Sequence, residues 1–339
     1  MNVVILSASR KVWLVRAFQQ AVSVCGGGRV LALDTDPLAA ALAVADTGSI
    51  SPPSNAAHFG RWLVDLCRRE SVGLVVPTRD EELDALAVLA AELRSVGALA
   101  AVSPAPAIAI CQDKRRFAQF CLVNGFATPC EIANPDDPAA FPAFVKPRKG
   151  KAGRDAARIE TIEALRARGF DPARDILQEW VVDPEFTIDV FTDLDGRVLS
   201  AVPRERLRVV AGESVVARTV SDRPLEHESA RIVAALGLQG HVTVQAFRGT
   251  DRIRFIEVNP RYGGGAALGF AAGCPTPEWL VRLAAGESVA PRMGCFTAGL
   301  WMFRHSTDVF LPEEAVPEFG RKETIIVNHG GSPDAHRAV

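Results

Sequence analysis

Apolar positions in the first hundred residues alternate between short continuous runs and segments with helical spacing. The continuous runs predict strands at 3–6, 29–34, 73–78 and 98–103. Between them, apolar residues recur every three or four positions and predict helices at 13–22, 61–70 and 81–93. Apolar strands that alternate with helices are typical of a parallel sheet covered on both faces. An α/β domain is therefore expected at the N-terminus.

The residues just beyond the carboxyl ends of these strands are polar or charged. Ligands of parallel sheets bind at that edge, so we take four of them as candidate substrate contacts: Arg10, Arg79, Asp80 and Glu81. Asp80 and Glu81 would favour a cationic amine, although an acid at this point serves equally well as a helix cap. No GxGxxG follows the first strand and no P-loop is present, so the nucleotide site is expected outside this domain.

After residue 111 the pattern changes to strands in hairpins with fewer helices. Strands are expected at 176–181, 185–191, 241–247 and 252–259. Helices are expected at 113–125 and 227–237. Two more strand-like runs lie near the end, at 297–303 and 324–328. This half of the chain is therefore predicted to be α+β with mostly antiparallel strands.

The composition is that of a globular protein and excludes several classes. Hydrophobic residues make up 48% of the 339 positions, too many for a disordered chain. With 38 basic and 40 acidic side chains, there is no overall field to attract nucleic acid. The uncharged stretch 95–112 is interrupted by Pro104 and Pro106, so it is not expected to span a membrane.

The cysteines point to a reducing compartment. There are 7 of them, an odd number, and no pair has the CxxC spacing of a zinc or redox site. The N-terminal residues lack the basic region, long apolar region and cleavage site of a signal peptide. We therefore expect a cytoplasmic protein with free thiols.

Two basic segments could bind phosphate. Five of the nine residues from Lys146 to Arg154 are basic, and two are glycines, so this loop could lay backbone and side-chain N–H groups along a phosphate chain and act as a lid. Taken alone, such a run is more often a solvated surface loop. In the second segment, 203–208, strand alternation puts Arg204, Arg206 and Arg208 on one face.

The segment 254–261 carries the residues best suited to a metal. Alternation along a strand places Glu257 and Asn259 on one face, and Gln245 of the neighbouring strand could add a third oxygen. Oxygen ligands of this kind suit Mg²⁺. Arg261 follows directly and could meet an anion held by the metal, and the glycines at 263–265 would let backbone approach a ligand closely. Gly263 and Gly264 are therefore further candidate substrate contacts.

Two acids lie beside an apolar strand. Glu179 is placed to read the edge of a base, and Glu185 could hold ribose hydroxyls. Each, taken separately, is more often a surface carboxylate.

The motifs occur in an order that resembles the ATP-grasp superfamily. The matching series is DK (113–114), FVKP (144–147) with its basic loop, QEWV (178–181), EFTIDV (185–190), PRERLR (203–208), VTVQAF (242–247) and IEVNPRYGGG (256–265). The resemblance covers about residues 1–290. It is strongest to single-module proteins similar to the carbamoyl-phosphate synthase large chain, which include carboxylate–amine ligases.

The resemblance implies a Rossmann-like preATP-grasp domain and an ATP-grasp fold that clasps ATP between two α+β subdomains. The implied parts are the preATP-grasp domain, a small subdomain with the lid loop, a large subdomain with the metal site, and a C-terminal extension that packs on the core. Their bounds would be 1–110, 111–182, 183–290 and 291–339.

The resemblance also implies residue roles at the nucleotide. Lys114 and Lys146 would contact the phosphates and the adenine side, joined by one of Lys149 and Lys151. Glu179 and the backbone of Val181 would read the adenine, and Glu185 would hold the ribose. Mg²⁺, or Mn²⁺ in its place, would be bound by Gln245, Glu257 and Asn259. Arg261 would lie near the transferred phosphate, with either Arg204 or Arg206 as a further basic group at the triphosphate.

The activity implied is ligation through an acyl phosphate, with ADP and phosphate released. The partners would be a small-molecule carboxylate and an amine or ammonia, without nucleic acid or membrane, and a homodimer is a possible assembly. A carboxylase or kinase on the same fold, or a module that binds ATP without turnover, are the alternatives. The sequence carries no Ser–His–Asp-like set, in keeping with phosphoryl transfer by positioning and electrostatics.

Overall fold

The computed structural model describes residues 1–150, 153, 155–210 and 212–313, so Lys151 and the predicted strand at 324–328 lie outside the described residues. The first hundred residues form a parallel sheet with the strand order β3-β2-β1-β4-β5. Its strands are β1 (Asn2–Ile5), β2 (Val30–Asp34), β3 (Thr47–Ile50), β4 (Val72–Val76) and β5 (Leu99–Ala100). Its helices are α1 (Val12–Val24), α2 (Ala40–Val44), α3 (Phe59–Arg69) and α4 (Asp80–Ser95).

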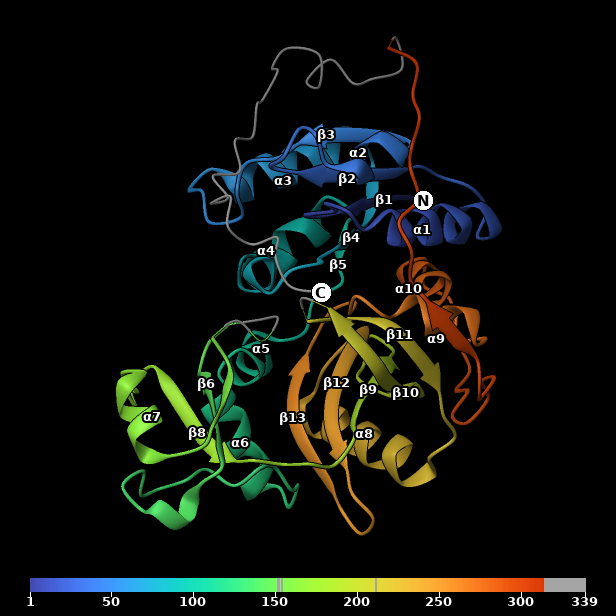
Figure 1. Ribbon diagram of the computed structural model, residues 1–339. Coiled ribbons are helices and arrows are strands. Elements are labelled where there is room, and N and C mark those ends of the chain that lie inside the picture. The colour runs from blue at the N-terminus through green and yellow to red at the C-terminus, as the bar shows by residue number, and fades with distance from the viewer. Residues whose placement is uncertain (151–152, 154, 211, 314–339) are drawn as a thin grey trace.

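The predicted parallel sheet is therefore present, with helices on both faces (Figure 1). Successive residues of β1 point to opposite faces: Val3 packs in a core cluster with Phe18 of α1, and Val4 packs in a second cluster with Leu63 of α3. The edge strand β3 was not predicted, because its sequence, TGSI, contains no continuous apolar run.

The second half of the chain contains two antiparallel sheets. The small sheet has the order β7-β6-β8. Its elements and the preceding helices are α5 (Ala105–Cys111), α6 (Lys114–Val123), a 3-10 turn (Pro138–Ala140), β6 (Ala143–Pro147), β7 (Ala157–Ile159), α7 (Ile162–Ala167) and β8 (Asp175–Glu179). The side chain of Asp113 caps α6 by accepting hydrogen bonds from the backbone N–H groups of Arg115 and Arg116.

The large sheet has six strands in the order β13-β12-β9-β10-β11-β14. Its strands are β9 (Glu185–Thr192), β10 (Val198–Val210), β11 (Glu213–Thr219), β12 (His241–Arg248), β13 (Ile253–Asn259) and β14 (Trp301–Phe303). The helices in this part are α8 (Arg223–Leu236), α9 (Ala267–Ala271) and α10 (Thr276–Ala284). The predicted strands at 241–247 and 252–259 form a hairpin, β12 with β13, whereas β8 and β9 lie in different sheets and β11 was not predicted. β14 lies at the sheet edge and pairs with β11, so the start of the C-terminal extension is part of this sheet.

The hydrophobic cores do not follow the expected domain bounds at every point. The small sheet has its own cluster, which includes Val145 and Leu177. In contrast, Phe117 and Cys121 of α6 pack in the same cluster as Ile188 of the large sheet. Helix α6 therefore belongs with the large sheet by packing, although the sequence groups it with the small one.

The N-terminal domain is also joined to the large sheet by a shared core. Helix α1 packs on α10, and the rings of Phe18 and Tyr262 meet edge to face with centroids 5.8 Å apart. In Figure 1 this domain (blue) lies above both antiparallel sheets. Within the described residues, every helix is too short or too polar to cross a bilayer.

Candidate active site

The predicted oxygen ligands lie together on one face of the large sheet. Gln245 on β12 is directly opposite Glu257 on β13, and Thr243 is opposite Asn259. The Nδ2 of Asn259 donates to Oε1 of Glu257 at 3.1 Å. With its amide nitrogen turned towards Glu257, Gln245 donates to the same oxygen at 3.0 Å. The alternation seen in the sequence therefore corresponds to a real cluster.

Two lysines approach this cluster from α6 and the small sheet. The Nζ of Lys114 lies 3.8 Å from Oε2 of Glu257 and donates to the carbonyl of Gly150 at 2.8 Å. Lys146 on β6 is 6% exposed. Burial lowers the pKa of Lys146 to about 8, and the nearby carboxylates of Glu257 and Glu185 offset this only in part.

Glu185 on β9 forms an ion pair with Arg206 on β10. Burial raises the pKa of Glu185, although Arg206 acts in the opposite direction. Arg206 also donates to the carbonyl of Gly212 at 3.0 Å. With its amide turned as above, Gln245 accepts a hydrogen bond from Arg206 at 3.3 Å. Arg206 is therefore part of the cluster.

Arg204, the other arginine considered for the triphosphate, has a different environment. It is 1% exposed, and its Nε and Nη2 donate to Asp189 on β9 at 2.7 and 2.8 Å. Alternation correctly puts Arg204 and Arg206 on the same face, but Arg204 is committed to an internal ion pair. Of the two arginines, Arg206 is the one that contacts the other candidate residues.

Glu179 and Val181 lie where the small sheet connects to the large one. Oε1 of Glu179 accepts a hydrogen bond from the backbone N–H of Cys130 at 3.1 Å and lies 3.6 Å from Nε of Arg254. Arg254 also donates to Asp183 at 2.6 Å. Val181 follows the end of β8, in the connection to β9. This connection is therefore tied to β13 by side chains on both sides of Val181.

Arg261 contacts the N-terminal domain. Its Nε and Nη2 donate to the two carboxylate oxygens of Asp80, at 2.8 and 2.9 Å. Burial alone would lower the pKa of Arg261, but the charge of Asp80 outweighs it and the pKa is raised. The structure thus brings Asp80 to Arg261, whereas the sequence suggested Asp80 as a contact for a cationic amine. Glu81 follows in the first turn of α4, and the side chains of Arg10 and Arg79 are exposed.

The three glycines after Tyr262 pack tightly against side chains of the chain itself. A Cβ at Gly263 would lie 2.7 Å from Oγ1 of Thr243, and one at Gly265 would lie 2.2 Å from Nη1 of Arg204. A Cβ at Gly264 would lie 3.0 Å from the carboxyl carbon of Glu213. Close internal packing therefore accounts for glycine at 263 and 265, independently of any ligand, whereas the neighbour at 264 is the flexible end of a side chain.

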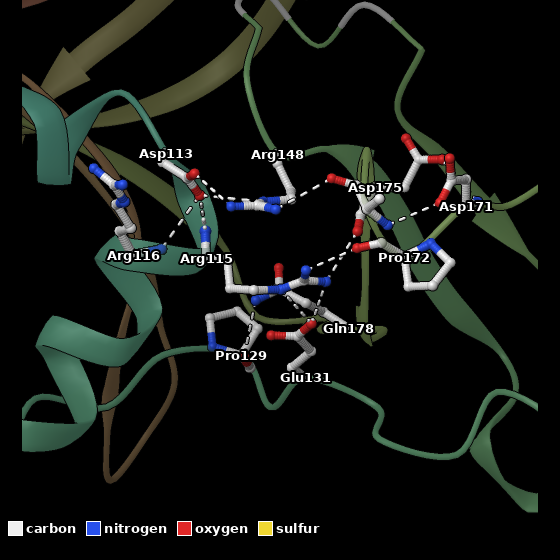
Figure 2. Close-up of polar contacts among 11 residues, drawn as sticks. Asp113, Arg115, Arg116, Pro129, Glu131, Arg148, Asp171, Pro172, Asp175 and Gln178 are labelled. Atoms are coloured by element: carbon white, nitrogen blue, oxygen red, sulfur yellow. Dashed lines mark hydrogen bonds and ion pairs between the residues drawn. The ribbon is translucent and has the colours of Figure 1, made fainter.

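The basic loop is anchored at its start. Arg148 donates to Asp113 at 2.7 Å, and its carbonyl accepts a hydrogen bond from the backbone N–H of Lys114 at 3.0 Å. Figure 2 shows Arg115 beside it, held by Glu131 and by the carbonyls of Pro172 and Asp175. These contacts tie α6 to the small sheet and fix the base of the loop, whereas Lys149 is exposed.

Sequence reasoning missed Lys11 and Glu82 in the N-terminal domain. Lys11 donates to the carbonyl of Ser7 and to Oγ1 of Thr78, each at 3.1 Å, and burial lowers its pKa to about 8. Glu82 is 2% exposed, and burial raises its pKa. Lys11 directly follows the candidate Arg10, so its place beyond β1 was a usable signal. Glu82 lies within a predicted helix, and no feature of the sequence distinguishes it from the other acids there.

The site contains fewer carboxylates than many metal centres. Across the part of the chain that the structure describes, no three His, Cys, Asp or Glu side chains are grouped so that they could hold a metal ion. The candidate set has one carboxylate, Glu257, and two amides, Gln245 and Asn259. Amide oxygens are acceptable ligands for a hard cation, so this set remains compatible with Mg²⁺.

Comparisons with known proteins support the predicted fold. Residues 3–101 match the family model "PylC-like, N-terminal domain", and residues 173–299 match "ATP-grasp in the biosynthetic pathway with Ter operon". The carbamoyl phosphate synthase large chain of Methanospirillum hungatei is 28% identical over 230 residues. That alignment covers 58% of this chain and 22% of the relative, so the chain corresponds to about a fifth of that protein.

Solved structures show the same fold at low identity. The biotin carboxylase domain of 2-oxoglutarate carboxylase from Hydrogenobacter thermophilus superposes with a TM-score of 0.67 at 16% identity, covering 88% of this chain and 73% of that one. N5-carboxyaminoimidazole synthetase from Staphylococcus aureus, complexed with ADP, gives a TM-score of 0.66 at 13% identity, with coverages of 86% and 78%. The chain therefore consists of a PylC-like N-terminal domain followed by an ATP-grasp domain.

Proposed function

We propose that this protein is an ATP- and Mg²⁺-dependent ligase that activates a small-molecule carboxylate as an acyl phosphate and joins it to an amine or ammonia. One observation carries the proposal. Lys114 at the start of α6 lies 3.8 Å from Glu257 on the large sheet, and Lys146 of the small sheet is close enough for the charge of Glu257 to raise its pKa. A nucleoside triphosphate with a bound cation presents the complementary charges to such an arrangement.

The nucleotide would lie along this contact. Lys114 and Lys146 would bind the phosphates, and Arg206 would add a third positive charge. Glu185 would hold the ribose, and Glu179 with the backbone of Val181 would read the adenine. Lys146, held at a pKa of about 8 by burial, would become fully charged beside phosphate, because a neighbouring anion favours the ammonium form.

The metal would be held by Glu257, Asn259 and Gln245. The amide nitrogen of Asn259 donates to Oε1 of Glu257, and that of Gln245 does so once its amide is turned. Rotation of each amide group presents its oxygen instead, so the three side chains can supply oxygen ligands without movement of the backbone. Bound Mg²⁺, or Mn²⁺ in its place, would supply neutralisation of the phosphate charges during transfer.

In this reaction, the protein positions the reactants and stabilises the charge that develops on the phosphates. A carboxylate oxygen attacks the γ-phosphorus of ATP, and the bond from that phosphorus to the bridging oxygen breaks, which gives the acyl phosphate and ADP. The amine nitrogen then attacks the acyl carbon, phosphate leaves with the bonding electrons, and the nitrogen loses a proton. The lysines and Arg206 stabilise charge on the phosphates, and Arg261 binds the anionic group nearest the reacting carbon.

The test is a screen of acids and amines for stimulated ADP release, with mass detection of the amide. Glu257→Gln should abolish stimulation because it removes the carboxylate of the metal set. Glu160→Gln is a matched control, since Glu160 lies on the surface with a side chain 63% exposed. AMP and pyrophosphate as products would contradict the acyl-phosphate mechanism. Stimulation by bicarbonate without amine would indicate a carboxylase, and a stable phosphorylated product would indicate a kinase.

A further inference from the structure

The guanidinium of Arg261 uses only one of its two edges within the protein. The edge formed by Nε and Nη2 donates to both oxygens of Asp80, and Nη1 makes a longer contact, 3.4 Å, to the carbonyl of Tyr262. A guanidinium has five N–H groups. Three are used here, which leaves one N–H on Nη2 and one on Nη1 without an acceptor among the described residues. These two form a second edge, suited to a pair of anionic oxygens.

Asp80 is held in place by the helix in which it lies and by neighbouring residues. It is the first residue of α4, where the helix dipole favours a negative charge. Its carbonyl accepts a hydrogen bond from Gln112 at 3.1 Å. The buried carboxylate of Glu82 accepts from the backbone N–H groups of Thr78 and Arg79, at 2.9 and 3.2 Å, and so fixes the turn that leads into Asp80.

The backbone of Arg261 is fixed as well. Its carbonyl accepts a hydrogen bond from Oγ1 of Thr243 at 3.0 Å, and its N–H donates to the carbonyl of Asn259 at 2.8 Å. The ion pair therefore joins two anchored points in different domains, 181 residues apart in the sequence. Both side chains are largely buried, with 16% of Arg261 and 22% of Asp80 exposed. A bidentate pair held in this way has one defined orientation.

We propose that Asp80 is a positioning residue that orients Arg261, so that the free edge of the guanidinium receives the anionic oxygens of the substrate. This inference rests on the proposed function, which gives Arg261 its role beside the reacting group. Because the backbone N–H of Arg261 donates to the carbonyl of Asn259 at 2.8 Å, Arg261 lies next to the metal set. The N-terminal domain thereby completes the active site, and the carboxylate of Asp80 is not available to an incoming amine.

A simple alternative makes the opposite prediction. If Asp80 only competed with the substrate for Arg261, its neutralisation would strengthen anion binding, because a nearby negative charge would be lost. If Asp80 orients Arg261, the same change weakens anion binding, because the freed guanidinium samples other rotamers and loses its bidentate geometry. The sign of the effect separates the two.

The probes are MgADP and then inorganic phosphate, a product of the proposed reaction, measured by titration calorimetry. Asp80→Asn should weaken phosphate binding to the MgADP complex by about tenfold and change MgADP affinity by less than about twofold. Asp80→Glu should recover part of the phosphate affinity. Asp84→Asn, the same change at an exposed position of α4, should change neither value. Unchanged or tighter phosphate binding in Asp80→Asn would overturn the proposal.

A second measurement does not depend on phosphate. In protein labelled with ¹⁵N-arginine, the Nε–H signal of Arg261 is identified by its loss in Arg261→Lys. Its hydrogen exchange should be slow in the wild type and in Asp84→Asn, and about tenfold faster or more in Asp80→Asn. Equal exchange rates would contradict the positioning role. Failure of the wild type to bind MgADP would instead contradict the proposed function, so the two failures are distinguishable.

Discussion

One face of the large sheet carries two groups of polar residues, of which only one is covered by a later part of the chain. We call Asp189, Arg204 and His241 the covered half. The open half consists of Glu185, Arg206, Gln245 and Glu257, together with Lys146 of the small sheet, whose pKa is affected by the charges of Glu257 and Glu185. Both halves use β9, β10 and β12, and both contain an acid on β9 paired with an arginine on β10. The covered half lies beneath residues 262–276, where His241 stacks on Tyr262 and contacts Thr276.

In the covered half, the charges of Asp189 and Arg204 satisfy each other. Burial alone would raise the pKa of Asp189, but Arg204 and His241 bring it down to about 2. The open half is different, because burial raises the pKa of Glu185 and lowers that of Lys146. Burial disfavours the charged form of such a group, and a ligand of opposite charge stabilises that form. Both halves contain the same types of residue. What distinguishes the structural ion pair from the candidate binding site is that residues 262–276 cover only the first of them.

The largest expected effect is on stability in the covered half. Arg204→Met leaves Asp189 as a buried carboxylate without its main partner, which should lower the free energy of unfolding by about 3–5 kcal/mol. Urea denaturation measures this directly. The double variant Asp189→Leu with Arg204→Met should be more stable than Arg204→Met alone. A loss below about 1 kcal/mol would mean that the covered half is not a structural pair.

The second effect separates binding from stability in the open half. Lys146→Met should weaken MgADP binding by about a hundredfold, because a buried ammonium at the phosphates is lost. The same change removes a desolvated charge, so the free energy of unfolding should stay equal or rise. Calorimetry and urea denaturation on one variant give both values. A lower free energy of unfolding together with unchanged MgADP affinity would show that Lys146 has a structural role and does not bind the nucleotide.

The third effect probes the glycines that connect the halves. Gly265→Ala places a Cβ where Nη1 of Arg204 now lies, at 2.2 Å, and this overpacking should lower the free energy of unfolding by about 1–3 kcal/mol. Gly264→Ala is the matched control, because its Cβ meets the flexible carboxyl end of Glu213 at 3.0 Å. Equal costs at the two positions would show that the buried guanidinium does not dictate glycine at 265.

The smallest effect is a proton count. The ordinary pKa of Lys146 is near 10.5 and the folded value is about 8, so the unfolded state binds more protons between these values and stability should rise with pH across that window. MgADP binding at about pH 9 should take up close to one proton, because phosphate restores the ammonium form. Calorimetry in buffers of different ionisation enthalpy measures this uptake.

Two variants control that measurement. Lys146→Met should abolish the uptake, and Lys11→Met should keep it, since Lys11 has a similar pKa of about 8 but lies in the N-terminal domain. Uptake that survives in Lys146→Met would assign the proton to another group of the cluster.

The sequence predicted those parts of the site that depend on local periodicity. Alternation along one strand was enough to put Glu257 and Asn259 on one face, and the partner strand supplied Gln245. The order of the motifs indicated the ATP-grasp fold, which the family models support. The edge strand β3 and strand β11 were missed, because neither has a continuous apolar run.

The other parts depend on contacts between distant segments. Arg204 and Arg206 have equivalent positions in the strand pattern, and only the chain after Arg261 decides that Arg204 is covered. The pairing of Asp80 with Arg261 crosses two domains, so no local pattern could distinguish it from a contact to substrate. The packing of α6 on the large sheet likewise follows from the tertiary fold.

The most direct test of the account is a crystal structure with Mg²⁺ and a non-hydrolysable ATP analogue. We expect the metal within about 2.1 Å of oxygens of Glu257 and Asn259. The phosphates should contact Lys114 and Lys146, and the covered half should be unchanged. A nucleotide bound elsewhere, or a metal that does not touch Glu257, would contradict the account.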